Sequence, residues 1–152
     1  MTRITELTVL QAGAIPFRLR EGRLEVLLVT ASKRRRWIVP KGHREAHQTL
    51  REAAVAEALE EAGVRGEASS LPFACWTYEK RGLYHRVELF PLLVTEELPE
   101  WEEDGKRLRR WFPAAKALRK LREPELIQAI ERLEGTLVET LSGGAVTSVE
   151  NM

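Results

Sequence analysis

Hydrophobic and polar positions follow two periods along the chain, one typical of strands and one typical of helices. Alternating or continuously apolar stretches predict strands over 7–19, 24–32, 36–40, 66–80, 83–96 and 107–112. Turn sequences around Gly22 and Gly82 predict that the first two strands form one hairpin and that 66–80 and 83–96 form another. Helical patterns cover 49–62, 114–120 and 123–137. The sequence therefore predicts a mixed α/β (α+β) fold.

The first predicted helix has recognisable ends. Thr49 is a good N-cap residue, and Gly63 is suited to end the helix in a left-handed conformation. Helical geometry places Val55, Leu59 and Ala62 on one side, which we expect to be the side that faces the core.

Length and composition indicate one compact domain. The chain has 152 residues, of which 43% are hydrophobic, enough to bury a core. We expect a single domain over 1–140, followed by a loose tail over 141–152 that has no periodicity. The formal net charge is only +1, so binding to nucleic acid or to an anionic membrane through a global positive field is not expected. Cys75 is the single cysteine, which excludes an internal disulfide.

The sequence also lacks the signals of membrane insertion and secretion. No apolar run reaches the roughly 20 residues of a membrane-spanning helix, and the polar start "MTRITEL" has no secretory hydrophobic region. We therefore expect a cytoplasmic protein without a membrane partner. The oligomeric state is left open, and a homodimer is one alternative.

Three glutamates gather on one helical face. Glu57, Glu60 and Glu61 stand at i, i+3 and i+4, and like charges at this spacing repel by about 0.2–0.5 kcal/mol per pair. A solvated acidic surface is the alternative, but only Arg65 of the neighbouring sequence is spaced to reach Glu61. The stripe thus needs a positive partner from elsewhere. Clustered carboxylate oxygens suit Mg²⁺, with Mn²⁺ as an alternative.

A carboxylate-bound divalent ion with a spare carboxylate is suited to hydrolysing phosphoanhydrides. The metal neutralises phosphate oxygens and lowers the pKa of bound water, and the spare glutamate accepts its proton. Such a site needs further donors for phosphate charge. The run "SKRRR" precedes the strand that leads to the glutamate helix, and we assign Ser32, Arg34 and Arg36 from it to substrate binding. A solvated basic loop is the alternative for this run.

Residues 42–64, "GHREAHQTLREAAVAEALEEAGV", resemble the Nudix box, G-x5-E-x7-R-E-U-x-E-E-x-G-U with U aliphatic. The resemblance implies the Nudix fold, a mixed sheet sandwiched between helices, and metal-dependent hydrolysis of diphosphate-containing compounds. By position, Glu57 and Glu61 would bind Mg²⁺ with the backbone carbonyl of Lys41, and Glu60 would be a further ligand or the catalytic proton acceptor. The turn residues Gly42 and His43 are assigned to substrate binding, with a solvent-facing loop histidine as the alternative for His43.

The match departs from the box at two positions. The first glutamate of the box is Gln48 here and its arginine is Ala56, which puts the catalytic rate in question but not the central carboxylates. A carboxylate from the loop "EWEEDG" is an alternative base, with Glu102, Glu103 and Asp104 as the candidates.

Outside the box, the stretches "RWIVPKG", "HRVELFPLLVTEELPEWEE" and "RRWFPAAKAL" are similar to the diphosphoinositol polyphosphate phosphohydrolases, which also cleave diadenosine polyphosphates. This resemblance assigns Arg36, Arg86 and Arg109 to polyphosphate binding, although Arg107 and Arg110 are equally near the last position. The first strand carries Leu10 and Gln11 where those enzymes have basic residues, and the turn "PKGH" is similar to that of diadenosine tetraphosphate hydrolases. Dinucleoside polyphosphates are therefore favoured over inositol pyrophosphates.

Several alternatives remain open from the sequence. Trp76, Tyr78 and Tyr84 would stack on a base or, more commonly for strand aromatics, pack in the core. An RNA 5′-end or ADP-ribose-type pyrophosphohydrolase would use the same box, but no basic–aromatic surface indicates a nucleic-acid partner. A non-catalytic nucleotide sensor would explain Gln48 and Ala56, but it would have no need for all three glutamates. A small phosphoanhydride is therefore the expected binding partner.

Overall fold

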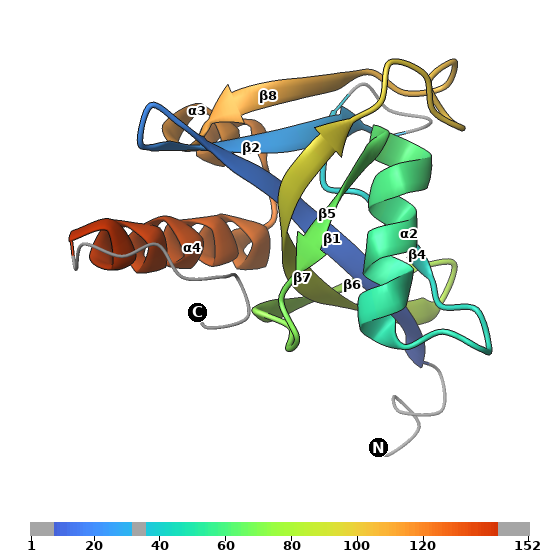
Figure 1. Ribbon diagram of the computed structural model, residues 1–152. Coiled ribbons are helices and arrows are strands. Elements are labelled where there is room, and N and C mark those ends of the chain that lie inside the picture. Colours follow the sequence, from blue (N-terminus) through green and yellow to red (C-terminus); the bar gives the residue numbers. More distant parts are fainter. Residues whose placement is uncertain (1–7, 32–35, 143–152) are drawn as a thin grey trace.

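The computed structural model describes residues 8–31 and 36–142, with the backbone alone for 138–142. Within these residues the chain forms eight strands and three helices (Figure 1). Their order is β1 (Thr8–Arg20), β2 (Arg23–Thr30), β3 (Trp37–Ile38), β4 (Lys41–His43), α2 (Leu50–Ala62), β5 (Val64–Ala68), β6 (Ala74–Lys80), β7 (Leu83–Glu97), β8 (Arg109–Pro113), α3 (Ala114–Lys120) and α4 (Pro124–Ser142).

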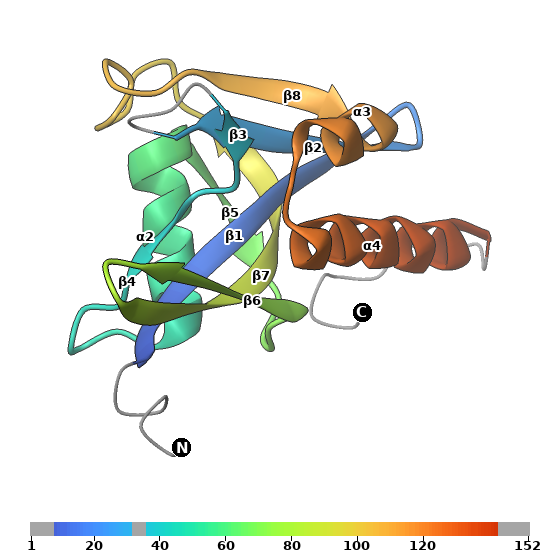
Figure 2. The ribbon, with the colours of Figure 1, turned by 180° about the vertical axis from the view of Figure 1, so that it is seen from behind.

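All eight strands belong to one mixed sheet. The central pair, β1 and β7, is parallel over ten residue pairs, and every other pairing is antiparallel. The main path runs β3-β2-β1-β7-β5, while β4 pairs with β1, β6 with β7 and β8 with β2. Helix α2 covers one face of the sheet and α4 lies on the other (Figures 1 and 2). The predicted sandwich of a mixed sheet between helices is confirmed.

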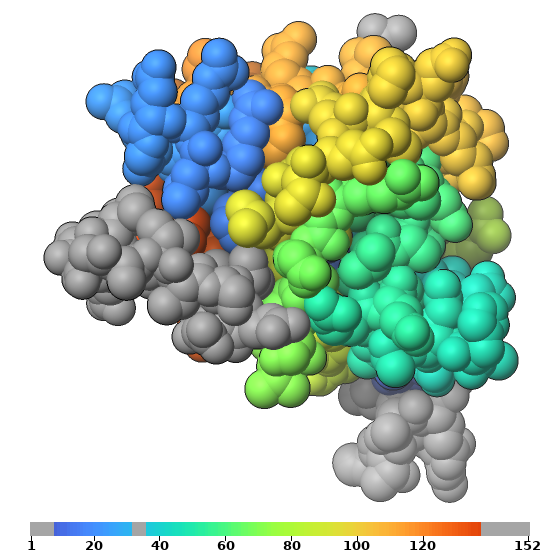
Figure 3. All heavy atoms as spheres, in the orientation of Figure 1, coloured from blue at the N-terminus to red at the C-terminus, as the bar shows by residue number. Residues whose placement is uncertain are grey.

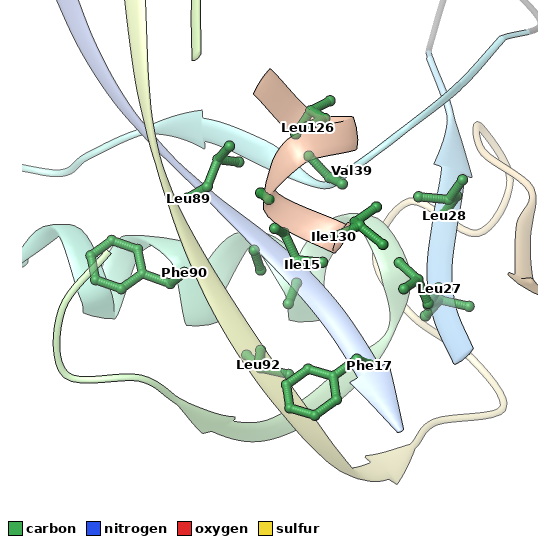
Figure 4. Close-up of a cluster of buried hydrophobic side chains, with 14 of the residues drawn as sticks. Ile15, Phe17, Leu27, Leu28, Val39, Leu89, Phe90, Leu92, Leu126 and Ile130 are labelled. Atoms are coloured by element: carbon green, nitrogen blue, oxygen red, sulfur yellow. The ribbon is translucent and has the colours of Figure 1, made fainter. Parts of the chain in front are cut away.

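The core occupies both faces of β1, which is why this strand is apolar without alternation. Positions 11–17 of β1 are all buried. Ile15 points toward α4, where it lies beside Leu126 and Ile130 together with Leu89 of β7 (Figure 4). Each fully buried side chain of this size stabilises the fold by about 1.5–3 kcal/mol. The central strands are thus held from both sides, and their ends provide a rigid frame for a site.

Helix α2 begins and ends as the sequence predicts. Thr49 and Glu52 form a reciprocal capping box, and Gly63 ends the helix at φ 66°. The prediction of its inward face holds for Ala62 and in part for Val55, which is partly buried and packs against the core, but it is wrong for Leu59, which is partly exposed. The residues buried against the sheet are Ala53, Ala54, Ala58, Glu61 and Ala62. Small alanines let the helix approach β1 closely, so one of the glutamates is carried inward with them.

The strands differ from the predictions in two places. The stretch 66–80 is divided into β5 and β6, because Pro72 has no N–H to continue a ladder and lies between them. The short strand β4 was not predicted. It pairs with β1 and holds the turn that leads to α2. Both predicted hairpins are present, with positive φ angles at Glu21, Gly22, Arg81 and Gly82.

The C-terminal helix is longer than predicted. Helix α4 reaches Ser142, two residues into the segment that the sequence assigns to a loose tail, and 143–152 lie outside the described residues. Among the helices that the structure describes, none combines the length and the apolar character needed to cross a membrane.

Candidate functional site

The carboxylate of Glu57 lies directly against the backbone of the β4 turn. A side chain at position 42 would place its Cβ 2.4 Å from the Cδ and Oε2 atoms of Glu57, which no real contact allows. Gly42 pairs with Ala12 of β1, so the turn cannot move away from the helix without breaking the ladder. Glycine at this position is therefore what allows the turn and the Glu57 carboxylate to meet.

Glu61 is held on both of its carboxylate oxygens. It is 7% exposed. Its Oε1 accepts a hydrogen bond from the backbone N–H of Lys41 at 3.2 Å, and its Oε2 lies 3.3 Å from Nη2 of Arg107. The backbone carbonyl of Glu61 accepts a hydrogen bond from Trp101 Nε1 at 3.0 Å. The side chain and the main chain of this residue are thus both fixed in place.

The three glutamates influence one another electrostatically. Burial, followed by the charges of Glu61 and Glu60, raises the pKa of Glu57 from 4.5 to about 8. Burial also raises the pKa of Glu61 to about 7, although Arg107 and the Lys41 N–H act in the opposite direction. Burial and the charges of Glu102 and Glu103 raise the pKa of Glu60. A cation placed between these carboxylates would favour their ionised forms.

Arg107 supplies the internal positive charge that the glutamate face requires. Besides Glu61, its guanidinium donates to Oε1 of Glu103 at 2.6 Å and to the backbone carbonyl of Thr30 at 2.9 Å. Arg65, the cation that the sequence offered, is exposed and pairs with Glu96 instead. No local pattern in the sequence indicates Arg107 for this role, because this residue enters the site from a loop before β8.

The loop between β7 and β8 brings a fourth carboxylate to the site. This segment lies beside α2 on the face shown in Figure 3, and the backbone N–H of Glu103 donates to the Glu60 carbonyl at 3.1 Å. Of the three loop candidates, Glu102 and Asp104 are exposed, whereas Glu103 is partly buried. Its charge contributes to the raised pKa of all three helix glutamates. Glu103 is therefore the loop carboxylate that the structure brings to the cluster.

A cleft of about 730 Å³ leads away from Lys41 and Glu61. Its walls come from β3, β4, β6 and the segment before α4, all on the side shown in Figure 2. Basic, aromatic and acidic side chains share the lining, among them Arg36, Lys41, Lys80, Arg107, Arg122, Trp76, Tyr78, Glu61, Glu79, Glu123 and Glu125. The cleft therefore places Glu61 in one space with several basic side chains, which are accompanied by further carboxylates.

The side chain of Lys41 is anchored within this cleft. Its Nζ donates to the Tyr78 hydroxyl at 3.0 Å, which in turn donates to Oε1 of Gln11 at 3.0 Å. The Tyr78 ring is stacked on His85 on one side, with centroids 4.8 Å apart, and the Lys41 ammonium lies 4.8 Å from its centroid. These contacts favour a packing role for Tyr78 over stacking on a base. The same contacts hold Lys41 in place, whose backbone carbonyl is the predicted metal ligand.

Arg36 lines the same cleft as Lys41 and Glu61. Its Nη2 donates to Oε2 of Glu123 at 2.5 Å. Its Nη1 is buried and has no acceptor among the described residues. Ser32 and Arg34, the other members of the predicted clamp, lie outside the described residues.

Three other predicted substrate-binding residues lie away from the cleft lining. Arg86 is exposed on the opposite face of β7 from His85, and it pairs with Glu88 at 2.7 Å. Tyr84 shares the face of Arg86. His43 is exposed at the end of β4, with its Nε2 3.5 Å from Nε2 of Gln11.

Arg109 has a structural environment. Its guanidinium donates to the carbonyls of Ala62, Gly63 and Leu98 and lies 3.9 Å from the Trp101 ring centroid. These contacts cap the C-terminus of α2, and the missing side chain of Gly63 makes room for them. The guanidinium donors of Arg109 are therefore occupied by backbone carbonyls and are not free for phosphate. Arg109 is also not among the residues that line the cleft.

Of the two departures from the box, Gln48 has a local role, whereas nothing in the structure explains Ala56. Gln48 Oε1 accepts from the Glu45 N–H at 3.0 Å, and the Gln48 N–H donates to the Glu45 carbonyl, so the amide holds the loop before α2 together. Ala56 is partly exposed on α2.

The donor set fits a divalent cation, although it is not a preassembled cage. Across 8–31 and 36–142, no three or more His, Cys, Asp or Glu side chains are arranged as a metal site. Two crowded carboxylates beside a glycine turn nevertheless offer the hard oxygen ligands that Mg²⁺ prefers, and Mg²⁺ commonly keeps several waters. Glu57, Glu61 and the Lys41 carbonyl would hold it.

Comparisons with known proteins agree with this arrangement. A family model described as the NUDIX domain matches residues 8–133. Nudix hydrolase 12, mitochondrial, from Arabidopsis thaliana is 35% identical over 143 residues, covering 80% of this chain and 70% of that protein. Diphosphoinositol polyphosphate phosphohydrolase 2 from Mus musculus is 35% identical over 130 residues, covering 82% of this chain and 71% of that protein.

The solved structures show the same fold. A C. elegans Ap4A hydrolase binary complex superposes with a TM-score of 0.72 at 23% identity, covering 86% of this chain and 98% of that chain. Enzymes of this family generally depend on a divalent metal, in line with the carboxylate cluster described above. The chain therefore belongs to the Nudix hydrolase family and is a Nudix pyrophosphohydrolase.

Proposed function

We propose that this enzyme hydrolyses phosphoanhydride bonds in dinucleoside polyphosphates, with diadenosine polyphosphates as the favoured class. The observation that carries the proposal is the continuous cleft from Glu61 and Lys41 to Arg36. A phosphate bound through metal at the glutamate end would leave the rest of a phosphate chain beside the cationic lining. Charge-assisted hydrogen bonds to phosphate are the strong ones, so a longer chain gains affinity along this lining.

In this proposal Mg²⁺, or Mn²⁺ in its place, is held by Glu57, Glu61 and the Lys41 carbonyl. The metal supplies neutralisation of phosphate charge and activation of water. Glu60 accepts the proton, and its raised pKa suits that role. The side chain of Lys41 and its Tyr78 anchor keep the ligand turn in position. A cytoplasmic location and a homodimer stay predictions.

The charge balance of the cleft supports the nucleotide class over inositol pyrophosphates. Among the described lining residues, five basic side chains are accompanied by four carboxylates: Glu61, Glu79, Glu123 and Glu125. An inositol ring carrying many phosphates would place several of them close to these carboxylates. Like charges held close together in a partly buried site are unfavourable. A linear phosphate bridge presents less charge per length and is the better match.

The test is a substrate panel with Mg²⁺, with products separated by chromatography. It would contain diadenosine tetra- and hexaphosphate, ADP-ribose, a 5′-triphosphorylated RNA oligonucleotide and a diphosphoinositol polyphosphate. We expect the highest kcat/KM for a diadenosine polyphosphate. A higher value for the inositol compound or the RNA would contradict the proposal, and removal of divalent metal should abolish turnover in every case.

A further inference from the structure

One arginine of the cleft lining has hydrogen bonds that are only partly satisfied within the part of the chain that the structure describes. Arg36 and Glu123 lie 87 residues apart in sequence and form a close ion pair, with side chains 23% and 12% exposed. The second terminal nitrogen of Arg36, Nη1, is buried without an acceptor among the described residues. A buried charged donor left unpaired is unfavourable. Arg36 is thus held by one carboxylate while part of its binding capacity is unused.

Glu123 is the better anchored member of the pair. Its Oε1 accepts from the Arg122 N–H at 3.3 Å. Its backbone carbonyl accepts from the N–H groups of Leu126 and Ile127 at 3.1 Å each, which begins α4. The carboxylate is therefore fixed to the start of a helix. Arg36 carries a long side chain from the residue before β3, so movement of the guanidinium is the easier way to change this contact.

We propose that Glu123 is a specificity-determining residue that competes with substrate phosphate for Arg36. This inference rests on the function proposed above. A phosphate chain long enough to reach Arg36 must draw the guanidinium away from Glu123 or bind beside that negative charge. A two-phosphate substrate ends before this point and does not meet the competition. Glu123 therefore reduces the advantage that long, highly charged chains would otherwise have.

Glu125 offers a matched control. It lines the same cleft and carries the same charge from the first turn of α4, two residues after Glu123, but the carboxylate partner of Arg36 in the described structure is Glu123. Glu125→Gln changes the field of the cleft without releasing Arg36. Glu123→Gln retains the shape of the side chain and an acceptor for the Arg122 N–H, while it removes the charge that holds the guanidinium.

The experiment measures equilibrium binding of inorganic tripolyphosphate by calorimetry, in wild type, E123Q and E125Q, each with and without R36A. Because the probe has no nucleoside and requires no turnover, the result does not depend on catalysis. We expect E123Q to tighten binding by ~5-fold or more, as expected when a charged hydrogen bond becomes available to the ligand. E125Q should change the affinity for tripolyphosphate by less than ~2-fold, because Glu125 contributes only a screened charge to the cleft.

The double variants decide the mechanism. With R36A present, E123Q should give no further gain, because the two residues act through one contact. An equal gain from E123Q and E125Q, or a gain from E123Q that persists in the R36A background, would overturn the proposal. If E123Q lowered the melting temperature strongly, E123D would replace it. The shorter carboxylate should then give part of the gain by withdrawing from Arg36, and no gain would count against the proposal.

Kinetics separate this inference from the proposed function. In an active enzyme, E123Q should lower KM for diadenosine hexaphosphate and leave KM for ADP-ribose unchanged. If the wild type cleaved neither diadenosine polyphosphate but E123Q still tightened tripolyphosphate binding through Arg36, the function would be wrong and the role of Glu123 would stand. If the polyphosphates were cleaved and E123Q changed nothing, only the role of Glu123 would be wrong.

Discussion

The protein contains two arginine–glutamate assemblies that differ in how completely they are bonded. At the metal end, Arg107 contacts two carboxylates and a backbone carbonyl, using Nε and both terminal nitrogens. Elsewhere in the cleft, Arg36 contacts one carboxylate, and its Nη1 has no acceptor among the described residues. The same two residue types thus form a closed network in one place and an incomplete pair in the other.

The difference indicates what each assembly is suited to do. A fully bonded cation holds Glu61 and Glu103 in one geometry, which a metal site requires. A cation with an unused donor can change its acceptor at a lower cost in free energy. A site that binds phosphate chains of different lengths requires such changes. The following predictions test this contrast, beginning with the largest expected effect.

Removal of Arg107 should cost much more stability than removal of Arg36. Arg107→Ala leaves two carboxylates without their cation, a loss of about 3 kcal/mol in the free energy of unfolding. Arg36→Ala should cost less than ~1 kcal/mol, since it also removes an unpaired buried donor. Urea denaturation of the metal-free proteins measures both. Mg²⁺ should recover part of the Arg107→Ala loss, and equal losses in the two variants would remove the contrast.

The carboxylates near Arg107 should differ in their catalytic contribution. Glu60→Gln should lower kcat by at least ~10²-fold, the usual contribution of a general base, with little change in KM. Glu103→Gln is the matched comparison, because its carboxylate is occupied by Arg107. Steady-state kinetics on diadenosine tetraphosphate decides between them. A larger loss of kcat in Glu103→Gln would assign the proton acceptor to the loop.

The effect of Arg36 should depend on the length of the phosphate chain. Arg36→Ala should raise KM roughly tenfold for diadenosine tetra- and hexaphosphate, as expected from the loss of one charged hydrogen bond. KM for ADP-ribose should stay the same. Arg86→Ala is the control, since Arg86 is an exposed arginine on the other face of β7. Equal changes for all three substrates would mean that Arg36 supports the fold instead.

The stability of the metal-free protein should depend on pH through Glu57. Its pKa is raised in the folded state from 4.5 to about 8, so between these values the folded protein holds a proton that the unfolded chain has released. Stability should therefore fall as pH rises through this window. Thermal denaturation at about pH 6 and about pH 8.5 should show a lower melting temperature at the higher pH. Mg²⁺ should raise the melting temperature by several degrees, and by more at the higher pH. Glu57→Gln should weaken both dependences and leave the part contributed by Glu61, whose pKa burial also raises, to about 7. A Mg²⁺ gain that Glu57→Gln left intact would place the ion elsewhere.

The sequence predicted the elements whose determinants are close together in the chain. The N-cap at Thr49 and the helix end at Gly63 were both predicted and found, because their determinants lie within a few residues of the helix. The reciprocal bond from Glu52 that completes the capping box was not predicted. Strand β4 was not predicted, because three residues that include a lysine and a glycine have no periodicity of their own. They form a strand because β1 offers them a ladder.

The sequence by itself determined the spacing of Glu57, Glu60 and Glu61, because helical geometry follows from local patterns. It did not determine which of them would be buried or which cation each would meet. The tertiary structure decided that alanines are the fully buried apolar residues of α2, while Val55 is only partly buried against the core and Leu59 is partly exposed. It also decided that Arg107 and not Arg65 reaches Glu61. It also brought Arg36 to Glu123 across 87 residues. Such contacts depend on how the strands pair and how the helices pack, and no local pattern contains that information.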